Sequence, residues 1–497
     1  MAYFYDRLSV MDNTFLLSET PTTPMHVSAI EIFEAGPLRT AEGGIDIAKI
    51  RAAYAGALHR IPRYRQKLLW IPIENRPVWV DDPDFNFEYH VRHVSLPRPG
   101  GEEDLRRVAS RVLANHLDRH RPLWEIWVVE GMQHDRFAII AKTHHCMLDG
   151  SAGVEMSQVL LSSSPDAKIA KPQPWIPRPI PTPQQLARDE AWRYATLPFR
   201  ALRGLREFRA EVEDVGAEIG ARAEALRDFF TSTASPASET PINGPLSPHR
   251  RFDWLNMSLA DVKAVRKQMG CTVNDVFLAT VTGACREYLQ GRGVALDDIV
   301  FRASTPVSLR AKDDHSQVGN RVSSWFVDLP VAESSRTRQL EAIHAETERL
   351  KQSRQAIGME MFMAAAEFAP SGILALGTGL ASGPFNLIIT NVPGPQFPLY
   401  MLGARLLALI PEVPLLENIG LGIALMSYDG RIFWGVTADY DLVPDLEHFI
   451  DLIERSFVEL ASSAGVEIAG FARNDATLRP ELLPATGAAG GAVSEAH

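Results

Sequence analysis

The residues best suited to chemistry stand in one short segment, KTHHCMLDGSAG, which contains His144, His145, Cys146 and Asp149. The apolar run DRFAIIAKT, which leads into the two histidines, predicts a buried strand. Adjacent residues on a strand point to opposite faces, so we expect one histidine to reach a reactant and the other to support it. A neutral imidazole can accept a proton from a hydroxyl group as that group attacks.

Alternative roles for these residues follow from the same segment. A zinc site normally uses HxH on a strand or HxxxH on a helix, so the HH pair predicts no metal. Cys146 could be a thiol nucleophile, but a small buried residue is the more common role for a lone cysteine. Asp149 and Gly150 form a turn before SAGVEMSQVLL, which predicts a helix. Asp149 is then either a helix cap or a buried aspartate paired with an arginine.

Composition limits the class of protein. The 497 residues exceed the usual size of a single core, which predicts two domains. With 50 Lys and Arg against 61 Asp and Glu, the net charge of -11 disfavours nucleic acid as a partner. Cys146, Cys271 and Cys285 show no CxxC spacing and suit a reducing cytoplasm. The sequence has no signal-peptide pattern and no long apolar run, so secretion and membrane spanning lose support. It has no GxSxG motif and no GxxxxGK[ST] motif, so serine-esterase chemistry and nucleotide-driven chemistry lose support as well.

Proline-rich and loose stretches divide the chain. Prolines recur over 171–183, and a second loose stretch covers 232–249. We therefore predict an amino-terminal domain over 1–180, a linker with a crossover helix over 181–249, a second domain over 250–475 and a flexible tail over 476–497. Both domains alternate strand-like and helix-like patterns, which predicts an α/β fold.

The helical part of the linker has an aromatic and aliphatic pattern from Trp192 to Phe208, interspersed with Arg193, Arg200, Arg203 and Arg206 and followed by Arg209. Such a helix can rest on an anionic membrane surface, and a crossover helix with an ordinary solvated basic side is the alternative. Elsewhere, Asp46, Ser258 and Thr272 are predicted helix caps, and Gly270 is a predicted helix end. Five strands are predicted in the second domain, over 299–303, 323–328, 387–390, 420–426 and 432–438.

As a complete pattern, HHxxxDG after an apolar strand resembles the active-site signature of the coenzyme A-dependent acyltransferase superfamily. The chain is more narrowly similar to the bacterial wax ester synthase/diacylglycerol acyltransferase family. The segments that carry this resemblance span nearly the whole chain: LSVMDNTFLLSETPTTPMHV at the start, RPLWE with Pro122, Leu123 and Trp124, TVNDVFLA with Asn274 and Asp275, PVSLR ending at Arg310, GN at Gly319 and Asn320, and TNVPGP with Thr390 and Asn391. Thr390 stands where the family usually has serine, and both side chains offer a hydroxyl.

The resemblance implies two chloramphenicol-acetyltransferase-like domains with an active-site channel at their interface. It makes His145 the base, while His144, Asp149 and Gly150 shape the site and Asp149 pairs with Arg310 or Arg302. Asn274 is either the oxyanion donor or a helix-starting residue. Asp275 is a predicted cap, and Pro122, Leu123 and Trp124 either line the pocket or pack in the core.

The function implied is O-acyl transfer from acyl-CoA to a fatty alcohol or diacylglycerol, giving wax ester or triacylglycerol. No bound cofactor or metal is expected, and acyl-CoA is the co-substrate. The expected location is cytoplasmic, with peripheral binding to the inner membrane or lipid droplets. A condensation-type enzyme with a carrier-protein donor and a non-catalytic lipid-surface protein are the alternatives.

Overall fold

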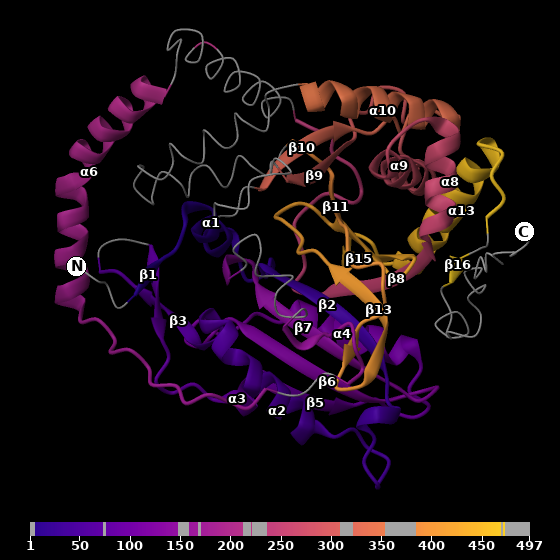
Figure 1. The fold of residues 1–497 in the computed structure, drawn as a ribbon. Helices are drawn as coiled ribbons and strands as arrows, with labels where there is room; N and C mark the ends of the chain where they lie inside the picture. Colours follow the sequence, from indigo (N-terminus) through magenta and orange to yellow (C-terminus); the bar gives the residue numbers. More distant parts are fainter. Residues whose placement is uncertain are drawn as a thin grey trace, which may run out of the picture.

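We describe the protein from a computed structural model. It describes residues 5–72, 76–147, 159–166, 170–211, 220, 236–308, 322–352, 384–468 and 471–472. Two large mixed sheets, each with its own helices, dominate the architecture (Figure 1).

The first sheet has six strands, in the order β12-β13-β2-β7-β6-β5. The strands are β2 (His26–Glu34), β5 (Val91–Ser95), β6 (Trp124–Met132), β7 (Arg136–His144), β12 (Tyr400–Met401) and β13 (Ala404–Glu412). Strand β7 is central, because it pairs antiparallel with both β2 and β6. The register between β7 and β2 is continuous, since all nine β7 residues, from Arg136 to His144, pair with β2.

Short elements surround this sheet. A small sheet joins β1 (Asp6–Arg7), β4 (Pro77–Asp81) and β3 (Gln66–Trp70). The helices are α1 (Val10–Ser18), α2 (Ile47–Ala57), α3 (Phe87–His90) and α4 (Glu102–Ala114), with 3-10 turns η1 (Gly36–Leu38), η2 (Leu58–Arg60), η3 (Pro62–Arg65) and η4 (His145–Met147). The predicted cap is confirmed, because the Asp46 carboxylate accepts the Lys49 N–H at the start of α2.

The second sheet has seven strands, in the order β10-β9-β11-β14-β15-β8-β16. The strands are β8 (Arg250–Ser258), β9 (Arg302–Ser308), β10 (Val322–Asp328), β11 (Leu387–Val392), β14 (Leu421–Tyr428), β15 (Arg431–Asp439) and β16 (Phe471–Ala472). The helices of this half are α8 (Leu259–Met269), α9 (Val273–Gly291), α10 (Arg336–Gln352) and α13 (Leu446–Ser463). In Figure 1 they gather along one side of the sheet.

Caps and ends in the second half follow the sequence prediction. Ser258 caps α8, and Gly270 ends that helix in a left-handed conformation with φ of 67°. Thr272 and Asp275 form a reciprocal capping box at the start of α9. The predicted strand over 299–303 was placed too early, since β9 begins at Arg302.

Strand β13 crosses from the second half into the first sheet, where it pairs antiparallel with β2. Its backbone lies against β15 of the second sheet: a Cβ added to Gly435 would lie 1.8 Å from the Pro411 carbonyl oxygen. Only glycine permits so close an approach. The two halves also meet where Ser110 on α4 accepts the Phe252 N–H at 3.1 Å. Strand β13 therefore connects the two sheets, because it pairs with β2 in the first and packs against β15 of the second. The predicted domain boundaries remain a prediction.

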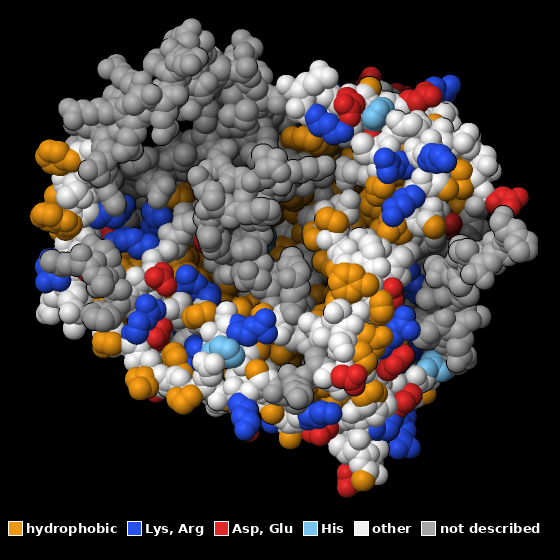
Figure 2. Space-filling view, in the orientation of Figure 1, with side chains coloured by type: hydrophobic (Ala, Val, Ile, Leu, Met, Phe, Trp, Pro, Cys, Tyr) orange, Lys and Arg blue, Asp and Glu red, His pale blue; other side chains and the backbone are white. Residues whose placement is uncertain are grey.

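Helix α6 (Pro183–Glu211) lies at the edge of the molecule (Figure 1). Its first turns are attached to the body, because Leu186 is buried and the Tyr5 hydroxyl donates to Asp189 at 3.0 Å. Hydrophobic side chains are visible over α6 at the left of Figure 2. No helix within the described ranges is both long enough and apolar enough to cross a membrane.

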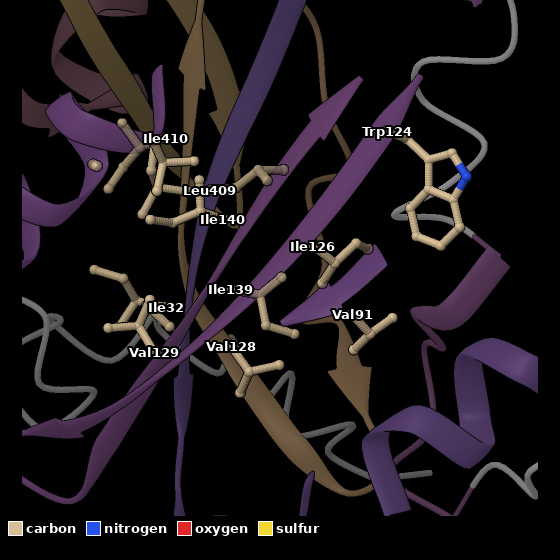
Figure 3. Packing of buried hydrophobic residues seen from close by; sticks show 14 of the residues in the cluster. Ile32, Val91, Trp124, Ile126, Val128, Val129, Ile139, Ile140, Leu409 and Ile410 are labelled. Carbon is tan, nitrogen blue, oxygen red and sulfur yellow. The ribbon is translucent and has the colours of Figure 1, made fainter. Parts of the chain in front are cut away.

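The core of the first half is built from aliphatic residues on neighbouring strands (Figure 3). Ile32 on β2 and Ile139 and Ile140 on β7 are fully buried there. Ile410 on the crossing strand is 1% exposed and belongs to the same cluster. The second half therefore contributes to the core on which β7, the strand ahead of the two histidines, rests.

Candidate active site

The two histidines belong to different elements. Strand β7 ends at His144, and His145 begins the 3-10 turn η4. The sequence argument from strand alternation was therefore wrong in detail, because His145 is not on the strand. A new backbone contact appears at this point: the His145 N–H donates to the Met25 carbonyl at 2.9 Å. The His144 N–H donates to the Leu123 carbonyl at 2.9 Å.

Both ring nitrogens of His144 are engaged. Its Nδ1 accepts the backbone N–H of Cys146 at 3.1 Å, and its Nε2 lies 3.3 Å from Oε2 of Glu19. A backbone N–H can only donate, so Nδ1 carries the lone pair and neutral His144 has its proton on Nε2. Burial lowers the pKa of His144, and the hydrogen bond and charge of Glu19 offset only part of that effect.

Glu19 follows directly after α1 and its carboxylate is buried. Its Oε2 accepts from the Arg119 guanidinium, with the Nε contact at 2.9 Å, as well as from His144. Burial by itself raises the pKa of Glu19, but the bonds and charges of His144 and Arg119 lower it to about 2. Glu19 is therefore an anion at neutral pH.

His145 has different surroundings. Its ring stacks on Phe15 of α1 with the centroids 3.7 Å apart and an interplanar angle of 19°. Its Nδ1 is buried and has no hydrogen-bond partner among the described residues. Burial lowers the pKa of His145 to about 4, so the imidazole is neutral and able to accept a proton near pH 7.

Cys146 is not suited to nucleophilic chemistry. It is 2% exposed, and burial raises the pKa of its thiol well above the ordinary value. A buried thiol that stays protonated is a poor nucleophile. Within the described residues, no three His, Cys, Asp or Glu side chains are arranged to hold a metal ion.

Pro122, Leu123 and Trp124 lie beside the histidines, and all three are buried. Besides the Leu123 carbonyl bond to His144, the Trp124 indole N–H donates to the Tyr64 carbonyl at 2.8 Å, and its ring stacks on His90 with centroids 4.5 Å apart. The sequence left two roles open for these residues, pocket lining and core packing. The contacts described here are those of core packing and of backbone pairing at the end of β7.

Asn274 and Asp275 lie on the first turn of α9. The Asp275 carboxylate is fully buried and, besides capping α9, contacts His344 Nδ1 and the Thr347 hydroxyl of α10, each at 2.8 Å. Asp275 therefore joins two helices as well as capping one. Asn274 is half-buried, and among the described residues no hydrogen bond connects it to either histidine.

The remaining predicted residues are distributed as follows. Thr390 and Asn391 are half-buried near the end of β11, which pairs with β14. Arg302 binds the Asp328 carboxylate on β10, with the Nε contact at 2.6 Å. Asp149, Gly150 and Arg310 lie outside the described residues, as do residues 151–158 of the predicted helix SAGVEMSQVLL.

A cavity of about 1050 Å³ lies between α4 and the second half. Arg106 and Arg111 of α4 line one side, and Arg251, Tyr440 and His448 line the other. The residues that line it include neither histidine and none of the other predicted site residues. The candidate site at the histidine end of β7 is therefore separate from this cavity.

Sequence reasoning missed Glu19, Arg119 and Phe15. Glu19 and Phe15 both stand in LSVMDNTFLLSETPTTPMHV, a segment that carried the family resemblance, but its contact with the histidines was not anticipated. The segment contains two acidic residues, Asp12 and Glu19, and nothing in the sequence distinguishes Glu19 as the one that reaches His144.

Comparisons with known proteins decide the family. Residues 8–277 match the wax ester synthase/diacylglycerol acyltransferase catalytic domain, and residues 318–461 match the C-terminal domain of the same proteins. The chain belongs to the wax ester synthase/diacylglycerol acyltransferase family. It is thus an acyltransferase, as the HHxxxDG segment indicated.

Individual relatives agree with this family assignment. A Mycobacterium tuberculosis H37Rv protein named as a diacylglycerol O-acyltransferase is 33% identical over 92% of this chain and 90% of its own length. The solved wax ester synthase/diacylglycerol acyltransferase of Marinobacter aquaeolei VT8 is 26% identical, with a TM-score of 0.64, over 93% of this chain and 100% of that one.

The fold is shared more widely than the family. The starter condensation domain of rhizomide synthetase matches with a TM-score of 0.57 at 14% identity, over 92% of this chain and 95% of that one. This likeness concerns the fold alone. It confirms the predicted pair of chloramphenicol-acetyltransferase-like domains.

Proposed function

We propose that this acyltransferase moves a long-chain acyl group from acyl-CoA to the hydroxyl of a fatty alcohol or diacylglycerol, with His145 as general base. The observation that carries the assignment is the contrast between the two rings. Both nitrogens of His144 are used within the protein, whereas His145 is neutral and its Nδ1 has no described partner. A base must have a free lone pair, so His145 suits the role better.

The proposed reaction needs one base and one hydrogen-bond donor. The acceptor hydroxyl oxygen attacks the thioester carbonyl carbon while its proton moves to His145. The tetrahedral intermediate then collapses, the carbon–sulfur bond breaks, and the CoA thiolate takes the proton from the imidazolium. Burial that keeps His145 neutral also disfavours the imidazolium, so we expect this cation to be short-lived. Asn274 remains our candidate for the donor to the oxyanion.

The test compares His145→Ala with His144→Ala in single-turnover assays of acyl-CoA with fatty alcohol and diacylglycerol. We expect His145→Ala to lose roughly a hundredfold to ten-thousandfold in rate while acyl-CoA affinity is kept. His144→Ala should lose activity together with thermal stability, because it removes a buried hydrogen-bonded ring. His120→Ala, at an exposed position, is the matched control.

Two results would contradict this proposal. A fully active His145→Ala, together with a folded but inactive His144→Ala, would transfer the role of base to His144. Turnover with acyl-carrier protein but not with free acyl-CoA would identify a condensation-type donor instead.

We further propose that α6 binds an anionic lipid surface, either the inner membrane or a lipid droplet. Trp192 is 66% exposed and Phe199 is 73% exposed, which is unusual for large apolar side chains in water. Arg188 on the same helix is also exposed. Aromatic and basic residues together on one helix are typical of interfacial binding.

Flotation with vesicles that contain anionic lipid tests the surface. We expect binding at low salt, weaker binding at high salt, and clear loss for Trp192→Ser/Phe199→Ser. Val458→Ser removes an exposed apolar residue on α13 and serves as control. Equal flotation of all three proteins would contradict the role of α6.

A further inference from the structure

The Glu19 carboxylate lies where the two supports of His145 meet. One support is the η4 turn, which begins with His145 and whose Cys146 N–H is bound by His144 Nδ1. The other is α1, whose Phe15 stacks on the His145 ring and whose last residue, Ser18, directly precedes Glu19. Glu19 contacts the first support through His144.

Arg119 connects Glu19 to the second support. Its guanidinium donates to Oε2 of Glu19 and also to the Leu16 carbonyl of α1, the latter at 2.9 Å. His116 adds a further bond, since its Nε2 donates to the Thr20 carbonyl at 2.8 Å, next to Glu19 in the chain. Arg119 therefore connects the Glu19 carboxylate to α1, and both Arg119 and His116 come from the segment after α4.

The position of the His144 proton depends on this carboxylate. The ring can accept the Cys146 N–H only while Nδ1 is unprotonated, and the proton must then stay on Nε2. Nε2 faces Glu19 Oε2 at 3.3 Å, an acceptor that carries a full charge. A neutral amide at this position could present its NH₂ group to Nε2 and favour the other tautomer, which would break the bond to Cys146.

We propose that Glu19 is a positioning residue, which fixes the Nε2–H tautomer of His144 and thereby orients the η4 turn and the His145 ring. Its effect on turnover rests on the proposed function, because it acts through His145 as base. Its effect on the His144 tautomer does not.

The variants are Glu19→Gln, which removes the charge at constant size, and Glu19→Asp, which keeps the charge on a shorter side chain. Asp81→Asn is the matched control, because Asp81 is a buried carboxylate paired with Arg178 at 3.0 Å, and within the described residues no hydrogen bond joins it to either histidine. The first measurement is nitrogen-15 NMR of histidine-labelled protein without substrate, with His144 assigned from the His144→Ala spectrum. It distinguishes the two tautomers by the shifts of Nδ1 and Nε2.

We expect wild type, Glu19→Asp and Asp81→Asn to keep the Nε2–H tautomer, and Glu19→Gln to lose it or mix the two. In single-turnover assays, Glu19→Gln should lose roughly 10- to 100-fold in rate, the cost of a hydrogen bond to a charged group, while acyl-CoA affinity changes less than about threefold. Glu19→Asp should recover part of the rate.

An unchanged His144 tautomer in folded Glu19→Gln would overturn the proposal. The proposal would also be overturned if Glu19→Gln lost no more rate than Asp81→Asn when the two variants lose equal thermal stability. The loss of rate would then be a structural effect only. If wild type shows no acyl transfer with any donor or acceptor, the proposed function fails, and the NMR comparison alone supports or overturns the role of Glu19.

Discussion

Replacing Asp275 with alanine should destabilise the second half of the protein by about 3–5 kcal/mol. The carboxylate is fully buried and accepts three hydrogen bonds from groups on two helices. These come from the Thr272 N–H at 2.9 Å, the Thr347 hydroxyl at 2.8 Å and His344 Nδ1 at 2.8 Å. Alanine would leave the buried Thr347 hydroxyl without this partner.

The magnitude follows from the chemistry of these bonds. A hydrogen bond to a charged group contributes about 1.5–3 kcal/mol, and losses within one network do not simply add. A loss of 3–5 kcal/mol is a large part of the 5–15 kcal/mol that is typical of a domain, and corresponds to a melting temperature lower by roughly 6–20 °C. Asp275→Asn should lose less, because the amide keeps one acceptor oxygen.

Urea and thermal unfolding of Asp275→Ala measure this effect. Ser258→Ala is the control. The Ser258 hydroxyl also caps a helix, where it accepts the Asp261 N–H at 3.2 Å, and its removal should cost only about 1 kcal/mol. If Asp275→Ala is no less stable than Ser258→Ala, the contacts to α10 contribute nothing measurable and the reasoning is refuted.

Three other predictions concern packing and pH. Gly435→Ala should unfold or strongly destabilise the protein in thermal melts, because its Cβ would lie 1.8 Å from the Pro411 carbonyl oxygen, whereas Gly291→Ala, with open space around it, should not. Single-turnover rate should stay nearly flat from about pH 5.5 to pH 8, because the pKa of His145 is lowered to about 4; a fall centred on an unperturbed value near 6.5 would contradict the assignment. Burial raises the pKa of Glu412 to about 8, so the folded state holds a proton that the unfolded state releases near 4.5, and stability should fall as pH rises from about 5 to 8. Urea unfolding of Glu412→Gln should show a weaker fall over the same range, and equal pH dependence would count against it.

Local signals in the sequence predicted the parts of the fold that are determined locally. The caps at Asp46, Ser258 and Thr272 depend on a side chain and an N–H three residues away, so the sequence contains the whole interaction. The crossing of β13 into the first sheet could not be predicted in this way. It depends on pairing with β2, more than 370 residues earlier, as in the Ile410 and Ile30 register, and nothing near β13 specifies that partner.

The same distinction between local and long-range contacts applies to the candidate site. The adjacent histidines were visible as a pattern, and so was the expectation that they differ. Their actual difference comes from Glu19 and Phe15, which lie about 130 residues away in the chain. Sequence spacing cannot say which distant side chain reaches a ring, so the tautomer of His144 and the stacking of His145 needed the structure.

The end of β7 explains why two neighbouring histidines can have separate roles. His144 is still in the sheet, in register with His26 of β2, so its backbone is fixed and its ring can be held by a buried carboxylate. His145 begins a turn, so its ring leaves the direction that strand alternation would impose and stacks on Phe15 instead. A base needs an orientation that leaves its basic lone pair free, and the stacking contact with Phe15 supplies one that occupies neither ring nitrogen. Substituting Phe15 should therefore disturb the orientation of His145 and leave the hydrogen bonds of His144 in place.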